Sequence, residues 1–216
     1  MRTPLKALIL CLAAATLAAC AASPLSRPAP DRRLFNISAQ RPEAAPAPKA
    51  APLAATVLKV RPLQINPAFQ GKELVYRLDG SRFDSDYYNT FFTQPAQNLT
   101  GQVRQWLGRA GLFGNVVDST SQVADTHLLE GMVNALYGDF TDKAAPKAVL
   151  EIQFFLVSNK GEAYTVLFQK DYSRTVAFQP GGSDAAALAQ AYNTALAEIL
   201  AELEGDIRQA LGKPSK

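Results

Sequence analysis

Three long stretches of alternating apolar and polar residues fill the C-terminal half of this 216-residue chain, at residues 127–140, 148–157 and 163–178. Each is predicted to be a strand with one buried face, as in the middle stretch, where apolar residues alternate with Glu151 and Gln153. Long strands that follow one another through short turns pair in the antiparallel sense. The sequence therefore predicts an antiparallel-rich sheet at the centre of the domain.

Two stretches of helical periodicity accompany these strands. The first covers residues 93–110, with Pro95 in its first turn and Gly111 just beyond its end. The second follows Ser183, its expected N-cap, and ends near Gly212, with its glutamates mostly on the solvent side. Shorter strands are predicted at residues 57–65, 73–78 and 113–117. The predicted fold class is α+β, an antiparallel-rich mixed sheet with two amphipathic helices packed on one face.

The N-terminus has the pattern of an export signal. A short basic start leads into an apolar run that is too short to cross a bilayer as a helix. The run ends Leu17-Ala18-Ala19-Cys20, which resembles the bacterial lipobox. We therefore predict that residues 1–19 are a lipoprotein signal peptide and that Cys20 becomes the acylated first residue. Ala21 rather than an aspartate follows, and by resemblance to sorted lipoproteins this favours the outer membrane.

The next segment, residues 20–55, is dominated by proline and alanine and shows no apolar periodicity. Leu34, Phe35 and Ile37 form one short apolar cluster, which is either incidental or a short docking motif around Phe35. We interpret the segment as the lipidated cysteine followed by a disordered tether. Residues 56–216 are then the folded domain, and we predict that they fold without the tether.

Composition and motifs argue against several function classes. Residues 56–216 hold 15 basic and 17 acidic residues, so the domain lacks the basic surface of a nucleic-acid-binding protein. Cys11 and Cys20 both precede the domain, which leaves it without a disulfide or a thiolate nucleophile. No nucleotide-binding or serine-hydrolase motif is present, and the single histidine is His127. The sequence predicts no enzyme activity, no catalytic or metal-binding residues and no cofactor.

A more specific pattern lies in residues 74–113. It reads LVYR at 74–77, FDSDYYNTFF at 83–92 and QWLGRAGLF at 105–113. Motifs of this kind in this order resemble the ABC-type transport auxiliary lipoprotein family, and the likeness extends more weakly over residues 57–211. The long proline- and alanine-rich segment is not part of that family's pattern.

The resemblance implies an accessory lipoprotein of an Mce-type ABC transporter, a class that moves lipids across the Gram-negative envelope. The implied partners are a periplasmic Mce-domain protein and the ABC permease and ATPase. The chain would sit on the periplasmic face of the outer membrane, held by its lipid, with no nucleic-acid partner, and self-association into a homo-oligomer stays open. Two alternatives are a structural or secretion-associated envelope lipoprotein and a periplasmic enzyme.

The aromatic segment at residues 83–92 is predicted to be a loop that docks to the transporter partner, because aromatic side chains concentrate at interface centres. Adjacent side chains of an extended segment point opposite ways, so Tyr87 and Tyr88 cannot both face a core. Phe91 and Phe92 have the alternative of packing onto the following helix. The predicted partner-binding residues are Tyr76, Asp86, Tyr87, Tyr88, Phe91 and Phe92.

Overall fold

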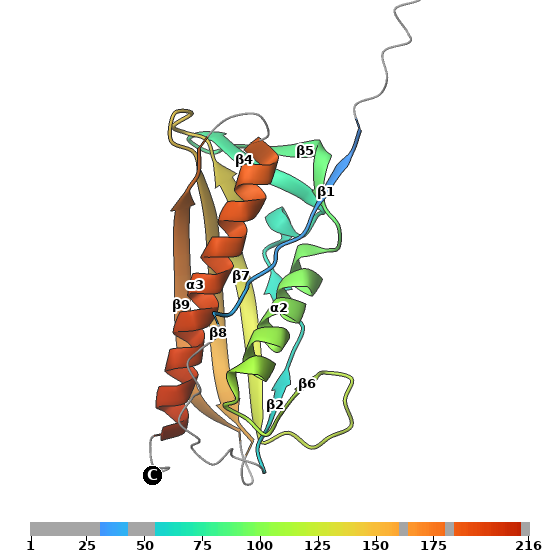
Figure 1. Cartoon of the computed structure of the whole chain (residues 1–216), viewed down its shortest axis with the longest axis vertical. Coiled ribbons are helices and arrows are strands. Elements are labelled where there is room, and N and C mark those ends of the chain that lie inside the picture. Colours follow the sequence, from blue (N-terminus) through green and yellow to red (C-terminus); the bar gives the residue numbers. More distant parts are fainter. Residues whose placement is uncertain (1–30, 43–54, 160–163, 180–183, 213–216) are drawn as a thin grey trace, which may run out of the picture. The chain divides into compact units, whose positions relative to one another are not determined.

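The computed structural model describes residues 31–42, 55–159, 164–179 and 184–212, which form a mixed sheet and two long helices (Figure 1). In chain order the elements are β1 (Arg33–Phe35), β2 (Val57–Val60), β3 (Gln64–Ile65), the 3-10 turn η2 (Pro67–Phe69), β4 (Glu73–Asp79), β5 (Arg82–Phe91), α2 (Pro95–Ala110), β6 (Asn115–Asp118), β7 (His127–Asp139), β8 (Lys147–Ser158), β9 (Thr165–Ala177) and α3 (Asp184–Gly212).

The three long strands β7, β8 and β9 form an antiparallel meander, as the alternating pattern predicts. The β7–β8 ladder runs from His127 opposite Ser158 to Asp139 opposite Lys147. The inward side chains of β8 are fully buried, among them Leu150, Ile152 and Phe154. The predicted α+β fold class is confirmed.

The opposite edge of β7 is lined by three short strands that the chain forms one after another. β2, β3 and β4 all pair with β7 in the parallel sense, so the chain from residue 57 to residue 77 runs along this edge in three steps. Pro62 separates β2 from β3 because proline has no N–H to donate to a ladder. The single strand predicted at residues 57–65 is therefore two strands.

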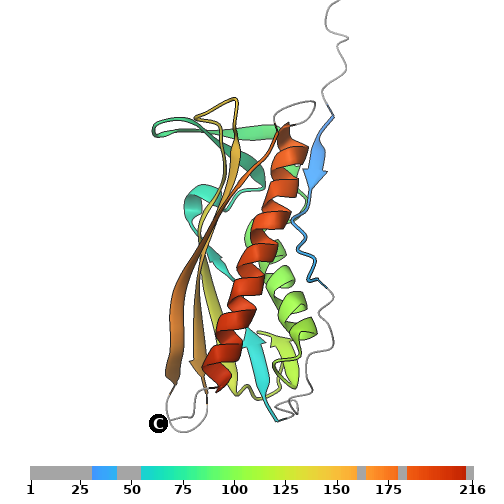
Figure 2. The same cartoon turned by 60° about the vertical axis from the view of Figure 1, so that its left-hand side comes forward.

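The two helices cover one face of the sheet (Figure 2). α2 packs over β2 and β6, and α3 packs over β8 and β9. Gly111 ends α2 in the left-handed conformation, with φ of 66°, as its position predicts. The predicted N-cap of α3, Ser183, lies outside the described residues. Within the described part of the chain, no helix is both long enough and apolar enough to cross a membrane.

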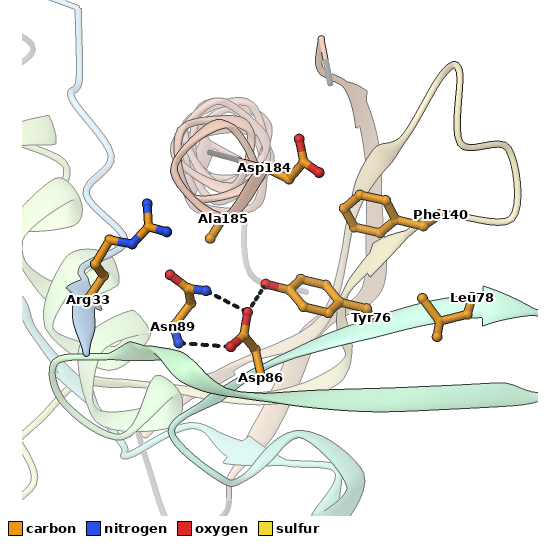
Figure 3. Close-up of a pocket in the computed structure, with 8 residues that line it drawn as sticks. All are labelled: Arg33, Tyr76, Leu78, Asp86, Asn89, Phe140, Asp184 and Ala185. Atoms are coloured by element: carbon orange, nitrogen blue, oxygen red, sulfur yellow. Dashed lines mark hydrogen bonds between the residues drawn. The ribbon is translucent and has the colours of Figure 1, made fainter. Parts of the chain in front are cut away.

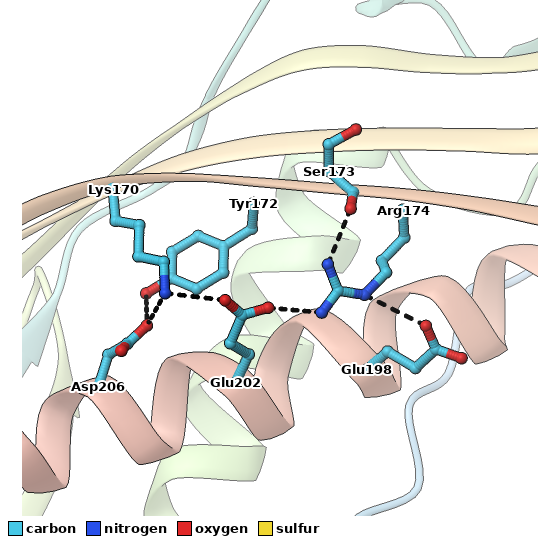
Figure 4. Close-up of polar contacts among 7 residues, drawn as sticks. All are labelled: Lys170, Tyr172, Ser173, Arg174, Glu198, Glu202 and Asp206. Carbon is cyan, nitrogen blue, oxygen red and sulfur yellow. Dashed lines mark hydrogen bonds and ion pairs between the residues drawn. The ribbon is translucent and has the colours of Figure 1, made fainter.

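A row of charged side chains holds α3 to the edge strand β9 (Figure 4). Lys170 lies 2.8 Å from both Glu202 and Asp206, and the Tyr172 hydroxyl donates a hydrogen bond of 2.8 Å to Asp206. Arg174 also pairs with Glu202 and extends the row along the helix to Glu198. Exposed ion pairs contribute little individually. Here they join α3 to β9 along the rim of a contact that is also apolar, with Tyr172 and Ile199 buried.

The N-terminal part of the structure corrects the sequence analysis. Residues 32–42, which we call the strap, were predicted to be disordered tether, and that prediction is wrong for them. β1 pairs in parallel with the end of β5, placing Arg33 opposite Asn89 and Phe35 opposite Phe91. Ile37 is 0% exposed within the hydrophobic core. The strap is thus an integral part of the domain.

Polar side chains of both helices hold the strap, which runs between α2 and α3 in Figure 1. Three consecutive backbone N–H groups of the strap donate hydrogen bonds to side-chain amide oxygens. The pairs are Ile37 to Asn98 at 3.2 Å, Ser38 to Asn193 at 2.7 Å and Ala39 to Gln102 at 2.9 Å. The helices therefore satisfy the backbone of the strap much as a neighbouring strand would.

A buried carboxylate fixes the far end of the strap. The Arg41 guanidinium donates two hydrogen bonds to Glu204, at 2.8 and 2.9 Å, and Trp106 Nε1 donates a third at 3.0 Å. Glu204 is only 9% exposed, so its predicted position on the solvent side of α3 is wrong. The hydrogen bond from Arg41 lowers the pKa of Glu204 and outweighs the opposing effect of burial. The folded domain therefore begins near residue 32. Residues 1–30 and 43–54, with Cys20 among them, lie outside the described residues.

Candidate functional site

The aromatic segment predicted to dock a partner is a strand rather than a loop. β4 and β5 form an antiparallel hairpin, turned through Gly80 at a φ of 44°. The five aromatic residues of the segment and Thr90 favour an extended backbone. The correction matters for the site because a strand of a sheet holds its side chains more rigidly than a loop does.

An irregularity in this hairpin produces the site. Glu73 pairs with Thr90, yet the next residue on β4, Leu74, pairs with Asp86. Residues 87–89 of β5 consequently have no partner on β4, and we call them the bulge. Bulges bend a strand and re-aim its side chains, and they are common beside functional sites.

Asp86 holds the bulge in place (Figure 3). Its carboxylate accepts hydrogen bonds from the backbone N–H groups of Tyr88 at 2.9 Å and Asn89 at 3.0 Å. It also accepts from the Asn89 side chain at 2.7 Å and from the Tyr76 hydroxyl at 2.8 Å. Burial alone would raise the pKa of Asp86, but these four donors outweigh it and lower the pKa. Burial and the bond to Asp86 raise the pKa of Tyr76, which keeps its hydroxyl protonated as a donor.

The bulge exposes two tyrosines to solvent. Tyr87 is 67% exposed and Tyr88 is 43% exposed, and their rings meet edge to face with centroids 5.2 Å apart. Phe92, just beyond β5, is 61% exposed. Phe91 differs: it is 4% exposed and packs against Tyr192 of α3, which agrees with the alternative that it packs into the fold and places it outside the exposed surface. The structure thus brings four of the six predicted residues together, Tyr87 and Tyr88 at the surface with Asp86 and Tyr76 beneath them. It exposes Phe92 nearby on the same chain segment and assigns Phe91 to the core.

The strap contributes residues that the sequence analysis did not select. The Arg32 guanidinium lies over the Tyr87 ring, 5.3 Å from its centroid. Arg33 lines a cleft of about 360 Å³ beside the bulge (Figure 3). The other residues that line this cleft are Tyr76, Leu78, Asp86, Asn89, Phe140, Asp184 and Ala185. The apolar cluster of Leu34, Phe35 and Ile37 was the signal in the sequence that could have revealed the strap.

The chemistry of the site is hydrogen bonding and aromatic contact. Asn89 presents a buried side-chain oxygen without a hydrogen-bond partner, and Phe140 packs edge to face on Tyr76 at 5.3 Å. His127 is distant in the fold, 3% exposed, and packs against Phe113. Among the residues that the structure describes, no three acidic, histidine or cysteine side chains are grouped so that they could hold a metal ion.

Comparison with known proteins agrees with this fold. Protein XCC0632 from Xanthomonas campestris, a DUF330 protein, superposes with a TM-score of 0.66 at 18% identity. The match covers 82% of this chain and 96% of that one. An uncharacterised protein of known structure matches with a TM-score of 0.53 at 18% identity, covering 68% of this chain and 92% of its own. At such identities the likeness concerns the fold alone. No curated protein matches this chain.

The sequence also matches a family profile described as ABC-type transport auxiliary lipoprotein component, over residues 35–204. The matched region begins inside the strap and reaches Glu204, its buried partner on α3. It contains the β4–β5 hairpin and the bulge, together with Asp86 and Tyr76, which hold the bulge in place. The chain therefore belongs to the ABC-type transport auxiliary lipoprotein component family.

Proposed function

We propose that this protein is a lipid-anchored accessory of an Mce-type ABC transporter that moves lipid across the envelope. The family match supports the link to ABC transport. The sequence Leu17-Ala18-Ala19-Cys20 after an export signal supports acylation, and Ala21 supports the outer membrane as the anchoring membrane. Energy would come from the permease and its ATPase, since the chain carries no nucleotide-binding motif.

The observation that carries the docking role is the bulge held by Asp86. Tyr87, Tyr88 and Phe92 form what we call the aromatic docking surface, and it faces solvent. Large, stiff aromatic side chains are the usual energetic centres of protein interfaces. Because Asp86 and Tyr76 fix the backbone beneath the tyrosines, little conformational freedom would be lost on binding. The proposed occupant is the periplasmic Mce-domain protein.

Binding measurements on two variants test this proposal. Tyr87→Ala and Tyr88→Ala should each weaken binding to the Mce-domain protein by about 1–2 kcal/mol, or roughly 5- to 30-fold in Kd. Their free energies of unfolding should change little because both side chains are exposed. Val166→Ala is the matched control, since Val166 is 58% exposed at the far end of the β8–β9 ladder.

Two outcomes would contradict the docking role. Normal binding by both tyrosine variants would show that the partner uses another surface. Marked unfolding of both would show that the rings support the fold.

Acylation has its own test, because the intact mass of the mature chain should show acyl groups on Cys20 and Cys20→Ser should lack them. A mature N-terminus at another residue would refute the anchor.

A further inference from the structure

The strap changes where a lipid anchor attaches to the domain. A tether reaching from Cys20 to residue 55 would join the domain at the start of β2. The strap is instead fixed by pairing with β5, by Ile37 in the core and by Arg41 on Glu204. The covalent path from Cys20 therefore first meets the folded domain at Arg32, with only residues 21–31 between them.

Chain length then limits the distance between anchor and domain. A fully extended chain spans at most about 3.3–3.6 Å per residue. The twelve steps from Cys20 to Arg32 can therefore cover about 40 Å at most. The 36 steps from Cys20 to Thr56 would have allowed about 120 Å.

The strap enters the domain beside the aromatic docking surface. Arg32 lies over Tyr87, and Arg33 pairs with Asn89 of the bulge. Val166 lies at the other end of the meander, where it pairs with Val157. The intervening β7–β8 ladder is about 40 Å long, because β7 has 13 residues and a strand rises about 3.3 Å per residue. The covalent path from Cys20 thus enters one end of the domain, and Val166 lies at the other.

We propose that the end of the domain formed by β1 and the bulge faces the lipid surface that holds Cys20, at a distance set by residues 21–31. Residues 43–54 only connect the strap to β2 and do not add to the reach. The proposal rests on the proposed acylation of Cys20. Leu34 is 57% exposed and follows Arg32 and Arg33 in the sequence, which suits such a position, because apolar side chains flanked by basic groups are accommodated at a lipid–water boundary. The transporter partner would then be engaged close to the anchoring membrane.

Single-cysteine labelling tests this orientation. No cysteine follows Cys20, so Leu34→Cys and Val166→Cys each introduce one reactive thiol at similarly exposed positions. The full acylated chain is placed in vesicles of phosphatidylethanolamine and phosphatidylglycerol that carry an acceptor-labelled lipid. Energy transfer from a donor at position 34 should exceed transfer from position 166.

Insertions separate the two candidate spacers. Twelve Gly/Ser residues inserted after residue 25 should lower the transfer efficiency at position 34. The same insertion after residue 48 should leave it unchanged, because the strap holds the domain upstream of that point. Equal transfer from positions 34 and 166, or an equal loss from both insertions, would overturn the orientation. A chain that fails to float with the vesicles would instead refute the acylation, and with it both proposals.

Discussion

Replacing Ile37 by alanine tests whether the strap belongs to the fold. Ile37 is 0% exposed, so the substitution removes three buried carbon atoms and leaves a cavity between the two helices and the sheet. At about 0.8 kcal/mol per buried methylene plus a cavity contribution, the loss in free energy of unfolding should be about 3 kcal/mol. For a domain of this size, that corresponds to a decrease of about 6–12 °C in Tm.

Urea unfolding of the chain lacking residues 1–20 provides the measurement. Leu34→Ala is the matched control on the same strap, because Leu34 is 57% exposed and should lose less than about 0.5 kcal/mol. If the strap detached before the rest of the domain, the loss would be limited to the free energy that holds the strap in place. A change of less than about 0.5 kcal/mol for Ile37→Ala would refute the reasoning and restore residues 32–42 to the tether.

Three further predictions concern stability. Glu204→Gln should lower the free energy of unfolding in urea by about 1–3 kcal/mol, because it removes the negative charge of the carboxylate that binds Arg41 of the strap. Glu198→Gln on the exposed side of α3 should lower it by less than about 0.5 kcal/mol. Asp86→Asn should lower the free energy of unfolding at pH 7. Because the pKa of Asp86 is lower in the folded than in the unfolded state, the wild type's greater stability is present above the unfolded pKa of about 3.9 and should shrink below it, in unfolding measured from pH 7 to 3. Gly131→Ala should lower the free energy of unfolding by about 1–3 kcal/mol, because its Cβ would lie 2.5 Å from a neighbouring side chain. Gly101→Ala within α2 meets nothing within 4 Å and should raise it by about 0.5–1 kcal/mol, and thermal unfolding of both would show the contrast.

The sequence predicted the elements that depend on local periodicity. The alternation in β8 and the end of α2 at Gly111 are visible in single segments, since each depends on residues close in the chain. The parallel pairing of β2, β3 and β4 with β7 depends on residues that are distant in the chain, and no local pattern encodes it. An antiparallel-rich mixed sheet was therefore predicted, but the pairing of its short strands with β7 was not.

The strap was missed for a different reason. Only Ile37 contributes a fully buried apolar side chain, and much of the remaining contact is polar. Asn98 and Gln102 are four residues apart on α2 and look like a solvated face until the strap covers them. Glu204 likewise looks exposed on α3 because its partner, Arg41, is 163 residues away. Contacts made by isolated residues far apart in the sequence leave no periodic signal.

The candidate site was predicted in part. We expected at least one of the Tyr87 and Tyr88 rings to face solvent, and the structure exposes both. The bulge that exposes them depends on a register shift between β4 and β5, which strand patterns do not reveal. Asp86 was selected as a partner-binding residue, and in the structure its visible role is to hold the bulge.

Site-specific photo-crosslinking in native cells tests the proposed function most directly. A benzophenone amino acid replaces Tyr88 on the aromatic docking surface or, as the control, Val166 at the far end of the meander. After irradiation, mass spectrometry of the covalent adducts identifies the protein in contact. The account predicts an adduct with an Mce-domain transporter protein from position 88 and none from position 166. Adducts from position 88 that contain no transporter component, or equal adducts from both positions, would contradict it.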